Sequence, residues 1–406
     1  MKKFFSFFGT FIFAASLSIP FAGCSVNKAN DLFKYDPTAN QSEWIITGIE
    51  KENGDGILEI PEKIDGKPVT QILSLDYRPN NEETSLHFTE IEKISIPKNV
   101  KLISPFACRD MVGLQEVLFT EDSQLEKIEQ GAFAGCKNLQ SIPFPESLNI
   151  LEGEAFDGCE SLTSLHLPKN LVQFGRSFHC GITTLTIDEE NQTYSIVDNV
   201  LYNKDKTILE YYPMCKPDEE FTILDSATQI VGEAFSNCKN LKNVHLGNVT
   251  KIGRCAFIGC ENIMEITADK LLYVDEYPFN DTAWYKNYQG GEISLGKVLL
   301  SYTKFAFALD LSGYRYIAPY AFQGHKDLHS ITFDNELTSI GTGAFKDCTN
   351  LYEVIFHNRS AMIFIGENVF ENNATNRFFK VYEPLYEEYI ENNFWQTYKD
   401  NITTYQ

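Results

Sequence analysis

The chain has 406 residues and a formal net charge of −22, because 56 aspartates and glutamates outnumber 34 lysines and arginines. So acidic a body repels polyanions, which argues against a nucleic acid or an anionic lipid surface as its partner. Length does not fix the number of domains, since this many residues could form several ordinary domains or one elongated repeat structure.

Residues 1–23 have the features of an export signal that is not part of the fold. Lys2 and Lys3 precede an apolar run without charges, and small residues end it. The tetrapeptide Phe-Ala-Gly-Cys ending at Cys24 resembles the lipobox of bacterial lipoproteins. We therefore expect lipidation at Cys24, followed by a short linker over residues 24–41. A plain secretory signal and a retained transmembrane anchor are the alternatives, and no second apolar run approaches the roughly 20 residues that span a bilayer.

A short phrase recurs through the rest of the chain, and it is clearest as Gly-Glu-Ala-Phe-Asp-Gly-Cys at residues 153–159. Its aromatic landmarks are Phe133, Phe156, Phe235, Phe257, Phe322 and Phe345, with degenerate copies at Phe106, Phe178, Phe279 and Phe370. Neighbouring landmarks are mostly 22 or 23 residues apart. This period is typical of leucine-rich repeats, whose coils bury their apolar face only by stacking on neighbours.

Each repeat is expected to hold one strand and one aromatic wedge. After Phe156 and Cys159, the segment 162–167 ends in the alternation of a strand with one buried face. Pro168 then ends the strand, because proline lacks an N–H. Phe156 is predicted to fill the interior of the coil, beside an alanine that lets the backbone pass close.

Two segments interrupt the period, at residues 195–213 and 282–305, and each predicts two strands around a polar turn. The opening after residue 42 predicts first coils with Leu58, Ile60 and Val69 as strand residues. The closing residues 380–406 predict a cap made of a short strand and an amphipathic helix. We expect this helix to place Tyr386, Ile390 and Phe394 on the last coil, because an open solenoid end exposes its core.

These repeats, inserts and ends together resemble the BspA-like family of bacterial surface proteins, which is built from Treponema-type leucine-rich repeats. The resemblance covers about residues 42–400. It implies a β-rich leucine-rich repeat solenoid over residues 42–379, in which curved, stacked coils of 22–23 residues carry the two β-hairpin inserts. The C-terminal cap with its short helix then closes the solenoid.

The ten cysteines are expected to be mostly reduced and buried, although disulfides are common in exported proteins. Cys136 and Cys159 are one repeat apart, and Cys348 has the same place in its own repeat. Stacked coils bring such positions within disulfide reach, but His325 occupies this place in one repeat. The remaining thiols of this register are Cys238 and Cys260, whereas Cys108, Cys180, Cys215 and Cys255 are off-register or nearly so.

Motifs for catalysis or cofactors are weak. Residues 291–298 have the spacing of a phosphate-binding loop, but Val298 stands where a magnesium-binding hydroxyl is needed. His179 and Cys180 are adjacent, which points them to opposite faces of a strand. The acidic residues 52–56 indicate a hairpin turn and are too few for a calcium loop. We find no acid, base and nucleophile to place on adjacent coils, and expect no catalytic residues, metal site or cofactor.

A binding face is better supported, because the outward residues of stacked strands would form one continuous sheet face. The predicted face is small, polar and mildly acidic, and consists of Ser141, Ser164, His166, Thr184, Thr186, Asn243, His245, Glu265, Thr267, Ser330, Thr332 and Glu353. A solvated surface without a ligand is the alternative interpretation.

The resemblance implies a lipoprotein anchored at the bacterial cell surface or outer membrane, without enzyme activity, that acts as an adhesin or protein-binding scaffold. Its partner would be an extracellular protein of a host matrix or of another bacterium, and its membrane contact would be the N-terminal lipid alone. One alternative is a glycan or peptide capture module for nutrient uptake, with exposed aromatics at Tyr211-Tyr212 or Trp284-Tyr285. Another is an envelope scaffold without a soluble ligand. Fold resemblance alone does not decide among them.

Overall fold

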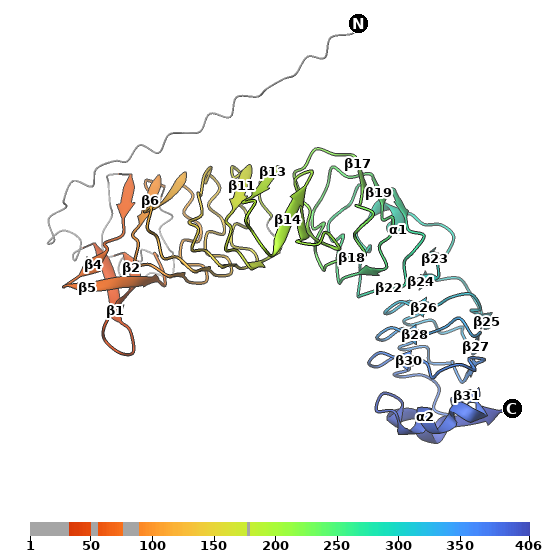
Figure 1. Cartoon of the computed structure of the whole chain (residues 1–406). Coiled ribbons are helices and arrows are strands. Elements are labelled where there is room, and N and C mark those ends of the chain that lie inside the picture. Colours follow the sequence, from red (N-terminus) through yellow and green to blue (C-terminus); the bar gives the residue numbers. More distant parts are fainter. Residues whose placement is uncertain (1–31, 50–55, 76–88, 177–178) are drawn as a thin grey trace, which may run out of the picture.

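The computed structural model describes residues 32–49, 56–75, 89–176 and 179–406. It shows an elongated solenoid that turns along its length (Figure 1). The predicted signal, Cys24, most of the acidic turn at residues 52–56 and the landmark Phe178 lie outside the described residues.

Each regular coil contributes two strands, one long and one short. In the clearest coil these are β10 (Ile150–Leu151), three residues before the Ala-Phe landmark, and β11 (Ser164–Leu167), after it. The long strand is the predicted one. The short strand is not predicted, because two residues are too few to show an alternating pattern.

The long strands form four separate parallel sheets. The first contains β3 (Ile57–Glu59), β6 (Lys93–Ile96) and β8 (Glu116–Phe119). The second contains β11 and β13 (Thr184–Ile187), and the third β17 (Glu220–Thr222), β19 (Asn243–His245) and β21 (Glu265–Thr267). The fourth contains β25 (Ala308–Asp310), β27 (Ser330–Phe333), β29 (Glu353–Phe356), β31 (Phe378–Tyr382) and β32 (Ile402–Tyr405).

The short strands form three sheets on the other side of the solenoid. The first contains β1 (Phe33–Pro37), β2 (Trp44–Ile49), β4 (Lys63–Ile64), β5 (Lys67–Ile72), β7 (Leu102–Ile103), β9 (Lys127–Ile128), β10 and β12 (Gln173–Phe174). The second contains β14 (Tyr194–Val197), β15 (Val200–Asn203), β16 (Ile208–Tyr211), β18 (Gln229–Ile230), β20 (Lys251–Ile252) and β22 (Tyr273–Val274). The third contains β23 (Glu292–Leu295), β24 (Val298–Tyr302), β26 (Tyr316–Ile317), β28 (Ser339–Ile340) and β30 (Phe364–Ile365).

The first insert has three strands, not the two expected from the sequence. β14 and β15 pair antiparallel around Asp198 and Asn199, whose positive φ angles of 51° and 63° suit a tight hairpin turn. β16 then pairs antiparallel with β15 and parallel with β18, which returns the chain to the solenoid. The third strand escapes prediction because it is also the short strand of the next coil.

The second insert forms the expected hairpin, β23 and β24, and β24 continues parallel to β26. A single helical turn, α1 (Ala283–Lys286), precedes it. The phosphate-loop spacing at residues 291–298 therefore lies in a strand hairpin, and no helix follows it to bind a phosphate.

Stacked aromatic rings fill the interior, as the landmarks predict. Phe235 stacks on Phe257 with ring centroids 4.6 Å apart, and Phe322 stacks on Phe345 at 4.8 Å. Tyr212 takes the wedge position after the first insert and stacks on Phe235 at 5.0 Å. The wedges confirmed as fully buried are Phe133, Phe156, Phe235, Phe257, Phe279, Phe322, Phe345 and Phe370.

The prediction of Phe106 as a wedge is wrong, since its side chain is 42% exposed. Cys108 takes the place instead: its N–H donates to the Ala132 carbonyl at 2.7 Å, just as the Phe133 N–H donates to Ala155 at 2.8 Å. The register of this coil is shifted by two residues from the apparent Ala-Phe match.

The two inserts divide the solenoid into three segments, which we name the first (residues 32–187), second (194–286) and third (292–406). The sheets end at the inserts, and three hydrophobic clusters overlap only at these junctions. Between the second and third segments the solenoid turns, with β18, β22, β26 and β28 on the inner side and β17, β19, β25 and β27 on the outer side (Figure 1).

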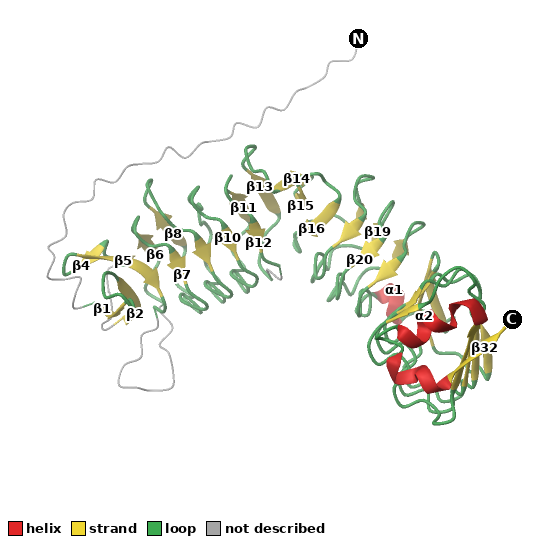
Figure 2. Ribbon diagram, turned by 60° about the horizontal axis from the view of Figure 1, so that its bottom comes forward, coloured by secondary structure: helices red, strands yellow, loops and turns green. Residues whose placement is uncertain are grey.

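The C-terminal cap closes the last coil with helical turns and strand β32. It contains the 3₁₀ turns η2 (Glu383–Leu385) and η3 (Gln396–Asn401) and the helix α2 (Tyr386–Glu391) (Figure 2). Tyr386 and Ile390 pack partly against the core as expected, but Phe394 is 56% exposed. The fully buried Trp395 takes its place, because the helix ends at Glu391 and helical periodicity does not continue to residue 394.

Candidate functional site

The predicted face lies on the outward side of the long strands. In β11 and β27 every second residue is buried, and the residues between them reach solvent. The same alternation places Thr184, Thr186, Asn243, His245, Glu265, Thr267 and Glu353 outward. Whether this surface binds a partner stays a prediction.

The face is not continuous, which corrects the expectation from the sequence. Ser141 makes only an isolated bridge to Glu116 of the first sheet. No strand follows it, because Pro143 and Pro145 lack the N–H groups that a ladder needs. The two inserts break the face twice more, so the predicted residues lie in four patches.

Within the patches, side chains of neighbouring coils form hydrogen bonds with one another. His166 Nδ1 lies 2.9 Å from Thr186 Oγ1, and His245 Nδ1 lies 2.9 Å from Thr267 Oγ1. His245 Nε2 also meets Glu220 Oε1 at 3.1 Å. The second and third sheets thus share a His-Thr pair in the same register, which orients small polar groups toward solvent.

The register cysteines are donors to the preceding coil. Cys159 Sγ lies 3.2 Å from the Phe133 carbonyl, Cys260 Sγ 2.8 Å from Phe235, and Cys348 Sγ 3.1 Å from Phe322. Each of these carbonyls belongs to a buried wedge and also accepts the backbone N–H of the residue three positions later, at 3.0–3.2 Å. The recurrent cysteine therefore supplies a second hydrogen bond to a buried backbone carbonyl.

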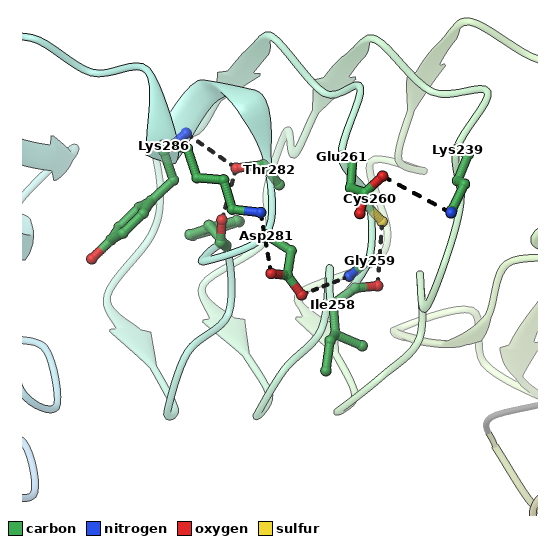
Figure 3. A network of polar contacts seen from close by, with 10 residues as sticks. Lys239, Ile258, Gly259, Cys260, Glu261, Asp281, Thr282 and Lys286 are labelled. Atoms are coloured by element: carbon green, nitrogen blue, oxygen red, sulfur yellow. Dashed lines mark hydrogen bonds and ion pairs between the residues drawn. The ribbon is translucent and has the colours of Figure 1, made fainter.

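Other donors replace the thiol where the cysteine is missing. His325 Nε2 donates to the Lys304 carbonyl at 2.6 Å, and the Asn373 amide, oriented toward Phe345, donates to its carbonyl at 2.8 Å. Figure 3 shows Cys260 and the next residue of this register, Thr282, whose hydroxyl donates at 2.7 Å to the Phe279 carbonyl of its own coil and so does not reproduce the contact with the preceding coil. In the same view Asp281 accepts from the Gly259 N–H at 3.0 Å and pairs with Lys286 at 3.4 Å.

A second donor position, two residues after the cysteine, was missed by sequence reasoning. Side-chain nitrogens of Asn138, Asn240, Asn262 and Asn350 each donate to a carbonyl of the preceding coil at 2.7–3.0 Å. The recurring Asn in Cys-Lys-Asn, Cys-Glu-Asn and Cys-Thr-Asn was the available signal.

The buried thiols are poor nucleophiles. Burial raises the pKa of Cys136, Cys180 and Cys348 from 9.0 to about 12, so each stays protonated near neutral pH. All nine described cysteines are free, as expected, and only Cys215 and Cys255 are partly exposed.

His179 does not pair with Cys180, which is buried, in agreement with the sequence analysis. It lies between two other residues: Asp157 Oδ1 is 2.6 Å from His179 Nδ1, and Ser236 Oγ is 3.3 Å from His179 Nε2. The expectation that no acid, base and nucleophile meet on neighbouring coils is therefore wrong. All three residues directly follow a wedge landmark, and the insert brings Ser236 next to the coil of His179.

A hollow of about 550 Å³ lies at the junction of the first and second segments. Its charged lining is Glu154 and Arg176 from the first segment and Glu233 and Arg254 from the second. Its glycines let the coils approach: at Gly175, a Cβ would lie only 1.9 Å from the Gly153 nitrogen.

The aromatic residues proposed as a glycan platform are not exposed as required. Tyr211 and Tyr212 are buried, and Trp284 and Tyr285 pack partly against the second core. Among the described residues, no helix could cross a bilayer, and no three His, Cys, Asp or Glu side chains are grouped to hold a metal ion.

The family model of the BspA type leucine rich repeat region matches the chain in six copies, over residues 82–208, 206–308 and 315–403. The pneumococcal vaccine antigen PcpA has a similar fold, with a TM-score of 0.53 and 21% identity, covering 92% of this chain and 96% of that one. A leucine-rich repeat protein from Eubacterium ventriosum has a TM-score of 0.51 and 20% identity, covering 86% and 95%. A leucine rich cell surface protein from Faecalibacterium prausnitzii has a TM-score of 0.41 and 22% identity, covering 81% and 94%. No curated protein matches the chain in sequence.

Proposed function

Because the chain belongs to the BspA-type leucine-rich repeat family, we propose that it is a bacterial cell-surface lipoprotein that binds extracellular proteins through its long strands. The observation that carries this proposal is the repeated outward presentation of small polar groups in equivalent registers of separate sheets. The lipid on Cys24 would hold the protein at the membrane and leave the solenoid free to reach a partner.

The divided face supports multivalent contact. Each patch has only a few small side chains, so a single patch would bind weakly. Patches on one body act together, because binding at one raises the effective concentration of the next. On the outer side of the turn, the strands β17, β19, β25 and β27 spread along the solenoid and suit a long partner (Figure 1).

The test is surface plasmon resonance of the full chain over immobilised fibronectin, fibrinogen and laminin, and over a set of glycans. We expect saturable binding to a protein. A variant carrying both Ser164→Lys and Asn243→Lys should bind at least tenfold more weakly, because it disturbs two patches at once. The control is Gln229→Lys, which adds one lysine to the short strand β18 on the other side.

Three outcomes would count against protein binding through this face. If the control variant binds as weakly as the double variant, the interface lies on another surface. Binding to glycans alone would favour the capture module. No binding at high micromolar concentration would favour the envelope scaffold.

A further inference from the structure

We propose that Asp157, His179 and Ser236 form a serine-hydrolase-type site for carboxylic esters, with Ser236 as the nucleophile. One imidazole nitrogen faces the carboxylate at 2.6 Å and the other faces the hydroxyl at 3.3 Å. This is the order of contacts that Ser-His-Asp chemistry uses on unrelated folds. The site uses no residue of the long-strand face, so this proposal can be tested independently of the proposed binding function.

Backbone hydrogen bonds fix the positions of Asp157 and Ser236. The Asp157 N–H donates to the Glu154 carbonyl and the Ser236 N–H to the Glu233 carbonyl, each at 2.9 Å. Asp157 and Ser236 thus occupy equivalent turns of two coils, one on each side of the junction. His179 contacts both, so the site exists only where the first insert brings the two segments together.

Among the described residues around Ser236, one donor is available for the negative charge that develops on the substrate oxygen. The N–H groups of Ser236, Asn237 and Cys238 already donate to carbonyls of the solenoid. The side-chain nitrogen of Asn237 lies 3.2 Å from Ser236 Oγ, within reach of an oxygen bound there. An amide side chain can act as such an oxyanion donor. With a single donor and a His179 side chain that is 40% exposed, we expect a slow esterase.

The adjacent hollow indicates the alcohol part of the ester. Glu154 and Glu233 belong to the same turns as Asp157 and Ser236, and both line the hollow. Arg176 meets Glu210 through one nitrogen and Arg254 meets Glu276 through one nitrogen, each at 3.4 Å. Each guanidinium has further N–H groups that can turn toward a ligand in the hollow.

This alternation of carboxylates and guanidiniums favours an uncharged polyol. Hydroxyl groups both donate and accept hydrogen bonds, so a sugar can meet both kinds of lining. A negatively charged ligand would be repelled by Glu154 and Glu233, and a positively charged ligand would be repelled by Arg176 and Arg254. The volume of about 550 Å³ lies within the range of small-ligand sites. The substrate class is therefore an O-acyl ester of a neutral sugar.

In the reaction, Ser236 Oγ bonds to the ester carbonyl carbon while its proton passes to His179 Nε2. The carbonyl oxygen carries the negative charge and accepts from the Asn237 amide. The bond to the sugar oxygen then breaks, and the imidazolium returns the proton to this leaving group. Water hydrolyses the acyl-serine by the same route and releases the carboxylic acid, with Asp157 holding the imidazole throughout.

The experiment uses the full chain, treated with a fluorophosphonate probe and mapped by peptide mass spectrometry. We expect the label on Ser236. Hydrolysis of p-nitrophenyl acetate should fall to the buffer rate in Ser236→Ala and at least tenfold in Asp157→Asn. Ser226→Ala, at an exposed serine of the second segment, is the control and should keep the parental rate. Circular dichroism and the thermal midpoint check that each variant is folded.

The substrate class is tested with O-acetylated cellobiose, following acetate release by NMR. The double variant Arg176→Ala/Arg254→Ala should lose at least tenfold in rate, whereas Arg315→Ala in the third segment should not. An equal rate in the double variant would refute the role of the hollow. No label on Ser236, or an unchanged rate in Ser236→Ala, would refute catalysis and leave the three residues as a hydrogen-bonded link between segments.

Discussion

At the scale of single residues, the recurrent cysteine has a structural role. A short thiol fits beside the aromatic stack and donates to the carbonyl of the preceding wedge. Asn373 donates to the same kind of carbonyl, that of the wedge Phe345. His325 donates instead to Lys304, two residues after the wedge Tyr302. Donor capacity and small size, not reactivity, explain why the position repeats.

Removing one such donor should destabilise the fold measurably. Cys260→Ala removes one of the two hydrogen bonds to the Phe235 carbonyl and opens a small void, so we expect the free energy of unfolding to fall by about 1–2 kcal/mol. Cys260→Ser should lose less, because its hydroxyl can still donate. Cys255→Ala, at a partly exposed thiol, is the control and should change stability by less than about 0.5 kcal/mol. Urea denaturation measures all three, and equal losses at both positions would contradict the donor role.

The buried thiols also predict alkaline instability. The pKa of Cys136, Cys180 and Cys348 is raised by burial from 9.0 to about 12. Above about pH 9 the unfolded chain loses these protons while the folded chain keeps them, so unfolding is favoured. Stability should be unaffected by these groups below pH 9 and should fall as the pH rises toward 12, by up to about 1.4 kcal/mol per pH unit for each thiol.

Urea midpoints measured from pH 8 to 11 test this expectation. Cys348→Ala should show a shallower decline than the parent chain, because one titrating group is removed. A midpoint that stays constant over this range would contradict the assignment of buried, protonated thiols.

At the scale of elements, the C-terminal cap seals the third core through one aromatic residue. Trp395 is fully buried, and its Nε1–H donates to the Ile363 carbonyl at 2.8 Å. Its ring contacts Phe356 and Phe379 edge-on. The neighbouring Phe394 points to solvent, which makes the two residues a matched pair.

Trp395→Ala should lower the stability of the third segment by about 3–5 kcal/mol, as expected for a large buried aromatic residue. Phe394→Ala should change it by less than about 0.5 kcal/mol. Thermal and urea denaturation followed by circular dichroism compare the two. Similar losses in both variants would mean that the cap is held by the helix as a whole and not by this side chain.

At the scale of the whole molecule, the inserts limit cooperativity. Sheet hydrogen bonding stops at each insert, and the cores of the three segments touch only at the junctions. In a stacked repeat protein, stability spreads through contacts between neighbours. Each junction is therefore a weak coupling point, although the wedge stack resumes with Tyr212 and with Tyr302 beyond the inserts.

Hydrogen exchange followed by mass spectrometry in increasing urea should resolve this behaviour. We expect amides of β9, β20 and β28, one strand from each segment, to lose protection at different urea concentrations. Trp395→Ala should shift only the transition of β28. The opposite result would be loss of protection in all three strands at one urea concentration, and a shift of all three in Trp395→Ala. It would show that the three segments unfold as one cooperative unit.

Local pattern by itself determined the repeat, its wedge residues and its buried strands. The 22 or 23-residue spacing of phenylalanines and the alternation in 162–167 depend on the backbone geometry of a single coil, which repeats wherever the sequence repeats. Phe106 and Phe394 were misassigned where a register shift or a short helix broke that periodicity. Placing the outward residues of the long strands also required no tertiary information.

Only the tertiary structure decided which coils meet across an insert. The first hairpin returns the chain so that Ser236 lies beside His179, 57 residues earlier, and opens the hollow between Arg176 and Arg254. This hairpin, the second insert and the prolines after Ser141 divide the predicted face into patches. Such contacts depend on how the strands of an insert pair with the strands of the next coil, as β16 pairs with β18. A pairing between strands far apart in sequence is not encoded in the period of either strand, so the sequence could not reveal it.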